Sequence, residues 1–226
     1  MTPAIRQHLF QIVFLVLIQA VILFVSVWRL DWWNAWAYLA LYLAYLILTA
    51  IVLLGRHPDL VEERSRVGEG AKSWDKVIAM ITGVGFISLL ILAGLDERQA
   101  WTGPLPPWVQ IAGLILLGAS YPLFTWAMVS NEYFSPIVRI QRDRGHAVQS
   151  GGPYRYIRHP GYLSLLISYL MLPVALGSWW AEIPAGLLVV NLLVRTTLED
   201  RTLQSELEGY QEYTTRVRFR LIPGIW

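Results

Sequence analysis

The sequence predicts an all-α protein: a polytopic membrane helix bundle of about six apolar segments, the last two forming a hairpin, with a cytoplasmic C-terminal helix. Charged residues make up only 15% of the 226 residues and apolar residues 55%, whereas a soluble domain has roughly 25% charged residues. The mean hydropathy is +0.46, and long stretches of the chain carry no charge. This composition excludes a disordered chain and an ordinary cytosolic domain.

The first four helices follow from uncharged intervals, each long enough for the roughly 20 residues that cross a bilayer. Together they form a predicted N-terminal membrane region over residues 1–129. The first helix is interpreted as a permanent anchor, because no small-residue cleavage pattern follows its apolar run. The four helices are expected at residues 9–28, 35–54, 77–95 and 108–129.

The remaining residues, 130–226, form the predicted C-terminal region. A long connection comes first, followed by an apolar hairpin over residues 161–195 that proline and glycine interrupt. An amphipathic helix over residues 200–213 is expected to lie on the surface, with Tyr210 and Tyr213 as anchors at the membrane interface.

The basic residues indicate how the helices are oriented. Of the 18 Lys and Arg residues, 16 fall in alternate connections of this arrangement, which the positive-inside rule places in the cytoplasm. Both termini and the connection before the hairpin are therefore predicted to be cytoplasmic. The net charge of +2 gives no reason to expect a nucleic acid partner. With no Cys and only four His, no metal site is expected either.

Two places carry candidate chemistry. Pro160 suits the first turn of the helix that opens the hairpin, and His159 stands beside that helix N-terminus, where an anion would be stabilised. The alternative is that this His-Pro step only starts the helix. Arg195 and Glu199 are spaced i, i+4, so they share a helix face and can pair. Ionisable residues at the end of a membrane helix also commonly face a ligand or a wet cavity.

The C-terminal region carries an ordered set of polar motifs: His146-Ala-Val-Gln-Ser-Gly-Gly-Pro-Tyr154, Arg158-His-Pro-Gly-Tyr162, Glu199-Asp200, Tyr210-x-x-Tyr213 and Ile222-Pro223. As a set, these motifs resemble the isoprenylcysteine carboxyl methyltransferase family, within the small integral-membrane methyltransferases that include phospholipid N-methylating enzymes. Where the family usually has Glu-Glu, this chain has Glu199-Asp200, which keeps both charges.

The resemblance implies a methyltransferase that uses S-adenosyl-L-methionine in a pocket facing the cytoplasm. It also implies that Arg195 faces the methyl acceptor and that Glu199 takes part in the chemistry. The residues that the resemblance places around the cofactor are Gln141, His146, Ala147, Val148, Gln149, Tyr154, His159, Pro160, Gly161, Tyr162 and Glu199.

The acceptor is expected to be lipophilic: a lipid, a prenylated substrate or a small molecule that reaches the protein through membrane lipids. A carboxylate acceptor needs no general base, because a negative nucleophile then meets a positive sulfonium. An amine or a phenol would need a base, and Glu199 is the first candidate. The oligomeric state stays open.

Two other readings fit parts of the same pattern. Membrane sterol and steroid reductases share an Arg-His-Pro-x-Tyr step and a terminal Tyr-x-x-Tyr, and the arginines near this step would then bind the phosphates of NADPH. A membrane protein without enzymatic activity, in which the hairpin only packs, is the other alternative.

Overall fold

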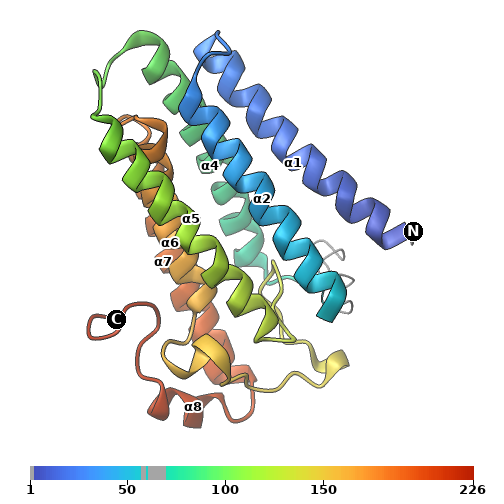
Figure 1. Ribbon diagram of the computed structural model, residues 1–226. Coiled ribbons are helices and arrows are strands. Elements are labelled where there is room, and N and C mark those ends of the chain that lie inside the picture. Colours follow the sequence, from blue (N-terminus) through green and yellow to red (C-terminus); the bar gives the residue numbers. More distant parts are fainter. Residues whose placement is uncertain (1–2, 57–59, 61–69) are drawn as a thin grey trace.

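A computed structural model describes residues 3–56, 60 and 70–226, and over these residues the protein is helical with no strand (Figure 1). The all-α prediction is therefore confirmed for the described residues. The α-helices are α1 (Pro3–Val27), α2 (Trp33–Arg56), α4 (Ser73–Gln99), α5 (Pro107–Val129), α6 (Pro160–Leu176), α7 (Glu182–Glu206) and α8 (Tyr210–Arg216), and the 3-10 turns are η1 (Arg142–Arg144) and η2 (Gly152–Arg155).

Among the described helices, α1, α2, α4 and α5 are long and apolar enough to cross a membrane. They coincide with the four segments expected in residues 1–129. α4 is longer than predicted, since it begins at Ser73 and ends at Gln99. Charged residues bound the apolar interval, but the backbone hydrogen bonds of a helix continue past them. α6 is a shorter apolar helix, so a total of six membrane segments stays a prediction.

Proline and glycine mark the ends of the helices that position the site. Pro107 and Pro160 occupy the first turns of α5 and α6, where the missing N–H of proline costs nothing. α6 ends at Leu176, and Gly177 follows it with a φ of +83° in the left-handed region. This backbone conformation favours glycine.

The helices form one packed bundle. α6 packs between α5 and α7, and α4 packs against both α1 and α7. At one end of the bundle, the connection after α5, the start of α6, the end of α7 and the short α8 come together (Figure 1). The core between the helices consists mainly of aliphatic side chains with almost no exposed surface, such as Leu23, Leu89, Leu117, Leu176 and Leu188.

The C-terminal helix differs from the prediction. α7 continues to Glu206, and α8 is a separate helix of 7 residues. Tyr210 and Tyr213 are only 4% and 2% exposed, so the expectation that they anchor the protein at the membrane interface is wrong. The hydroxyl of Tyr213 instead donates to the carbonyl of Tyr154 at 2.6 Å, which fastens α8 to the connection before α6.

Candidate active site

A pocket lies at the end of the bundle where these segments meet, with about 100 Å³ of space for water-sized molecules. The loop after α5 forms one wall, the first turn of α6 the floor, and the end of α7 with α8 the other wall. Nine residues that the sequence analysis placed around a cofactor line this pocket: His146, Ala147, Val148, Gln149, Tyr154, His159, Gly161, Tyr162 and Glu199.

Three of the predicted residues do not line the pocket. Gln141 is 1% exposed. Its Nε2 donates to the carbonyl of Tyr133 at 2.8 Å, and its Oε1 accepts from Arg144 at 2.6 Å. Both polar groups of its side-chain amide are therefore hydrogen-bonded within the loop. Pro160 is buried in the first turn of α6, which it starts. Arg195, on α7, pairs with Asp75 of α4.

Two residues that do line the pocket are held together by a hydrogen bond. The hydroxyl of Tyr162, on α6, donates to Oε2 of Glu199, on α7. One wall and the floor of the pocket are thereby joined, and a carboxylate faces the cavity. The ring of His159 stacks on that of Tyr162 with centroids 5.6 Å apart.

The side chain of Arg195 does not form the ion pair with Glu199 that their spacing allows. Its Nε donates to Oδ1 of Asp75 at 2.9 Å and its Nη2 to Oδ2 at 3.3 Å. The guanidinium lies 5.6 Å from the centroid of the Tyr162 ring, and Tyr162 lines the pocket. The sequence analysis missed Asp75, because 119 intervening residues conceal the pairing and only the chain fold brings the two charges together.

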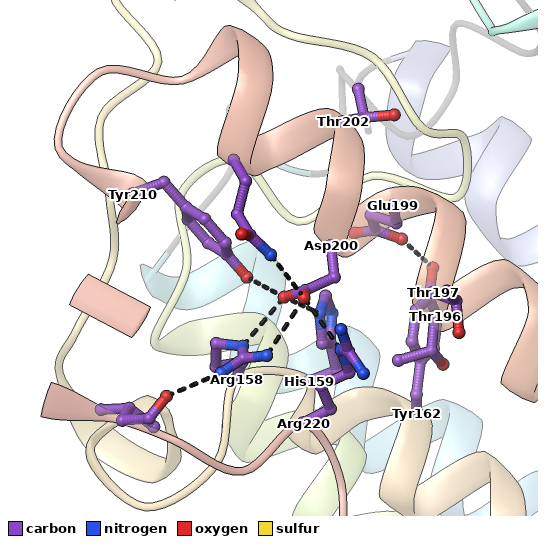
Figure 2. Close-up of polar contacts among 12 residues, drawn as sticks. Arg158, His159, Tyr162, Thr196, Thr197, Glu199, Asp200, Thr202, Tyr210 and Arg220 are labelled. Carbon is purple, nitrogen blue, oxygen red and sulfur yellow. Dashed lines mark hydrogen bonds and ion pairs between the residues drawn. The ribbon is translucent and has the colours of Figure 1, made fainter. Parts of the chain in front are cut away.

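Asp200 is a second residue that the sequence analysis undervalued. It has no exposed surface and accepts hydrogen bonds from five side chains (Figure 2). Burial by itself would raise the pKa of Asp200, but the hydrogen bonds from His159, Arg158 and Arg220 outweigh burial and hold its pKa well below the usual range. The donors and distances are Arg158 Nε 2.9 Å and Nη2 3.0 Å, Arg220 Nε 2.9 Å, Gln204 Nε2 2.9 Å, Tyr210 Oη 3.0 Å and His159 Nε2 3.3 Å.

This cluster fixes the orientation of His159. Because the carboxylate of Asp200 only accepts hydrogen bonds, the contact requires a proton on Nε2 of the imidazole. The same cluster holds the C-terminal segment, since Nη1 of Arg158 donates to the carbonyls of Val217 and Arg218. A buried arginine such as Arg158 needs a compensating acid, but its burial appears only in the folded structure.

The loop wall is ordered by aromatic and polar contacts. The imidazole of His146 stacks on Tyr133 with centroids 4.4 Å apart, and its Nδ1 accepts from the backbone N–H of Gln141 at 3.2 Å. Burial, with the nearby Arg139 and Arg144, lowers the pKa of His146 to about 4. His146 is therefore neutral at pH 7, which its role as an acceptor requires.

A second, larger cavity lies among α1, α2, α4, α5 and α6, with about 480 Å³ of space and a mainly apolar lining. Phe124 lines this cavity and Phe134 lines the first pocket. The two rings meet edge to face with centroids 5.3 Å apart. A Cβ on Gly161 would lie 2.9 Å from the Phe134 ring. An aromatic pair that rests on Gly161 thus lies between the two cavities.

Comparison with known proteins supports the resemblance. Residues 111–205 match the model of the isoprenylcysteine carboxyl methyltransferase (ICMT) family. Protein-S-isoprenylcysteine O-methyltransferase of Schizosaccharomyces pombe is 25% identical over 150 residues, which are 66% of this chain and 58% of that protein. The aligned part therefore spans less than two thirds of this curated relative. The family predicted from the C-terminal motifs is thus the family whose model matches residues 111–205 of this chain.

Proposed function

We propose that this protein is an integral-membrane methyltransferase that transfers the methyl group of S-adenosyl-L-methionine to a lipophilic acceptor, a carboxylate in the first instance. The observation that carries the proposal is the adjacency of two cavities of different character. One is a polar pocket that Glu199 and Tyr162 line, and the other is a larger apolar cavity among helices that can span a membrane.

The polar pocket suits the chemistry of the cofactor. S-adenosyl-L-methionine supplies a methyl group on a positively charged sulfur, and a carboxylate and aromatic ring faces favour such a cation. Glu199 and the rings of Tyr154 and Tyr162 line the pocket. The residues that would hold the cofactor are His146, Ala147, Val148, Gln149, Tyr154, His159, Gly161, Tyr162 and Glu199, while Gln141 and Pro160 would act by shaping the loop and the first turn of α6.

Methyl transfer to a carboxylate requires no covalent intermediate with the protein. The nucleophile and the methyl carbon must be aligned and water excluded. A negative nucleophile meets a positive sulfur, and a site of low dielectric constant strengthens their attraction. The carboxylate needs no general base. Within the described part of the chain, Nη1 of Arg195 has no hydrogen-bond partner, and in this proposal it donates to the acceptor.

The lipophilic part of the acceptor would occupy the larger cavity. Residues of α1, α2 and α4, outside the region that matches the family, supply much of its lining. The name of the Schizosaccharomyces pombe relative indicates isoprenylcysteine as the acceptor of that protein. We extend the chemical class, a carboxyl group on a prenyl-bearing or similarly apolar molecule, to this chain.

The proposed orientation places the pocket and both termini in the cytoplasm. The connection before α6 and the segment after α7 lie together at the α8 end of the bundle (Figure 1), and both carry several arginines. A positive charge excess in these segments is typical of the cytoplasmic side. Modification of single engineered cysteines in the Cys-free chain by a membrane-impermeant reagent would test this orientation.

Label transfer tests the activity. Purified protein in detergent is incubated with methyl-labelled S-adenosyl-L-methionine and a membrane lipid extract, and binding of S-adenosyl-L-methionine and of NADPH is measured in parallel. We expect label in a lipophilic product and no NADPH binding. Glu199→Gln and His159→Ala should abolish transfer while the helical circular dichroism is retained.

Two outcomes would contradict the proposal. Normal transfer by both variants would show that the site lies elsewhere. Binding of NADPH without binding of S-adenosyl-L-methionine would replace the methyltransferase with a reductase. The exposed Glu212, on α8, provides the matched control, because it does not line the pocket. Glu212→Gln removes the same charge and should leave transfer unchanged.

A further inference from the structure

The side chain of Asp75 is the point where the N-terminal helices contact the candidate active site. Asp75 lies in the first turn of α4, outside the segment that matches the family, and it is 1% exposed. Both its carboxylate oxygens have partners on other elements. A buried carboxylate with complete hydrogen bonding fixes the position of each of its partners.

One partner is a wall of the pocket. Oδ2 of Asp75 accepts from the backbone N–H of Val138 at 2.7 Å, and the carbonyl of the same residue accepts from the N–H of Lys72 at 3.2 Å. Val138 lines the pocket. The start of α4 thus holds the loop after α5 through both polar groups of a single peptide residue.

The other partner is Arg195. The carboxylate of Asp75 accepts hydrogen bonds from both Nε and Nη2 of Arg195. Nη2 also donates to the carbonyl of Pro136 at 2.7 Å. The guanidinium is therefore fixed in its plane, against the ring of Tyr162. The hydroxyl of that tyrosine donates to Glu199. A chain of contacts thus runs from Asp75 to the carboxylate that faces the pocket.

We infer that Asp75 is a positioning residue of the methyl-transfer site. It fixes the guanidinium of Arg195, which the proposed function assigns to the acceptor, and it holds the loop after α5 in place. The inference rests on the proposed function, to which it adds a residue that the family match does not reach. Removal of the carboxylate charge would leave Arg195 free to turn, and a misplacement of about 1 Å in such a site costs roughly a hundredfold in rate.

The alternative is that Asp75 only joins helices and adds stability. The two roles differ in a double-mutant cycle, because residues that act through one another are not additive. The variants are Asp75→Asn, Arg195→Gln and the double variant. Asp96→Asn is the matched control, since Asp96 is also a buried acid of α4, 2% exposed, at the far end of the helix.

The first measurement is kcat/KM for label transfer. In the wild-type background, Asp75→Asn is expected to lower kcat/KM by roughly 10- to 100-fold. In the Arg195→Gln background, adding Asp75→Asn should lower kcat/KM no further. The control Asp96→Asn should affect thermal stability and leave kcat/KM within about twofold of wild type. The positioning role would be overturned if Asp75→Asn lowered kcat/KM by the same factor in the wild-type and Arg195→Gln backgrounds, or if it did not lower kcat/KM at all.

The second measurement does not depend on activity. Trypsin cleavage after Arg142, an exposed residue of the loop, is followed by mass spectrometry of the folded protein. We expect roughly tenfold faster cleavage in Asp75→Asn and no change in Asp96→Asn, because local opening sets the cleavage rate. Unchanged cleavage would show that Asp75 does not hold the loop.

Label transfer and trypsin cleavage together distinguish a failure of the proposed function from a failure of the inference about Asp75. A wild-type protein that transfers no label to any acceptor would refute the proposed function, and with it the catalytic consequence of Asp75, whereas the cleavage rates would still show whether Asp75 holds the loop. Normal wild-type transfer with an additive double-mutant cycle would refute the inference alone.

Discussion

His146 is a residue whose protonation state the fold decides. Its pKa falls to about 4 from an ordinary 6.5 because of burial and two nearby arginines. The unfolded chain therefore binds a proton between pH 6.5 and 4 that the folded chain does not. Stability from this group is complete above pH 6.5 and is lost as the pH falls towards 4.

Substitution of His146 by Asn tests this. Asn offers an acceptor oxygen to the N–H of Gln141 but does not titrate. We expect the melting temperature of the wild type in detergent to fall by about 4–8 °C more than that of His146→Asn between pH 6.5 and 4.5, which corresponds to about 2 kcal/mol. Parallel melting curves for the two proteins across this range would contradict the assignment.

Asp200 carries a prediction about stability. Asp200→Asn keeps the shape of the side chain but leaves Arg158, 8% exposed, without its counter-charge. Loss of one partner of a buried ion pair costs about 3–5 kcal/mol, which urea unfolding monitored by circular dichroism would detect. Asp143→Asn, at an exposed carboxylate that pairs with Arg139, is the control and should leave the curve unchanged. An equally small effect of both variants would mean that the cluster contributes nothing to the fold.

Single residues also show where sequence reasoning stops. The spacing of Arg195 and Glu199 predicts a shared helix face, which is local information. The actual partners, Asp75 for Arg195 and Tyr162 for Glu199, come from other helices. A local pattern cannot reveal such a choice, because it depends on how the helices pack.

At the scale of elements, the first turn of α6 depends on the absence of a side chain at Gly161. A Cβ here would lie 2.9 Å from two atoms of the Phe134 ring, so Gly161→Ala must displace a residue that lines the pocket. We expect a destabilisation of about 1–3 kcal/mol and weaker binding of S-adenosyl-L-methionine by isothermal titration. Gly186→Ala is the control, because a Cβ on that helical glycine meets nothing within 4 Å. Unchanged cofactor binding in Gly161→Ala would show that the ring position is unimportant.

The elements were predictable to different degrees. The four long helices followed from hydropathy because the bilayer imposes a length and a composition on each span. The division of the C-terminal segment into α7 and α8 did not follow. Tyr210 looked like an interfacial anchor because a tyrosine has an apolar ring and a polar tip, but the buried carboxylate of Asp200 satisfies its hydroxyl instead. Nine of the pocket-lining residues came from the resemblance, and none from hydropathy.

At the scale of the whole molecule, the larger cavity predicts a preference for long-chain over short carboxylate acceptors, and a single substitution should change this preference. Gly83 lines this cavity, and a Cβ added there meets nothing within 4 Å. Gly83→Phe should therefore fill the cavity without disturbing α4. We expect kcat/KM for a long-chain carboxylate to fall by roughly tenfold, from loss of about 1.4 kcal/mol of apolar contact, while a short water-soluble carboxylate is methylated as before.

The neighbouring residue gives the control. Val84 is 62% exposed, so Val84→Phe adds the same ring on the outer surface of the same helix. It should leave the preference for long chains intact. Equal effects of the two variants on both acceptors would show that the cavity does not receive the acceptor.

The hydrogen bonds to the segment around residues 219 and 220 also have a consequence for biosynthesis. The backbone N–H groups of Arg158 and His159 donate to the carbonyls of Phe219 and Arg220 at 3.0 and 2.9 Å. Those two carbonyls are translated some 60 residues after their donors. The pocket floor is thus assembled only when translation has passed residue 220, and a ribosome stalled before that point would carry membrane-inserted helices without a finished binding site.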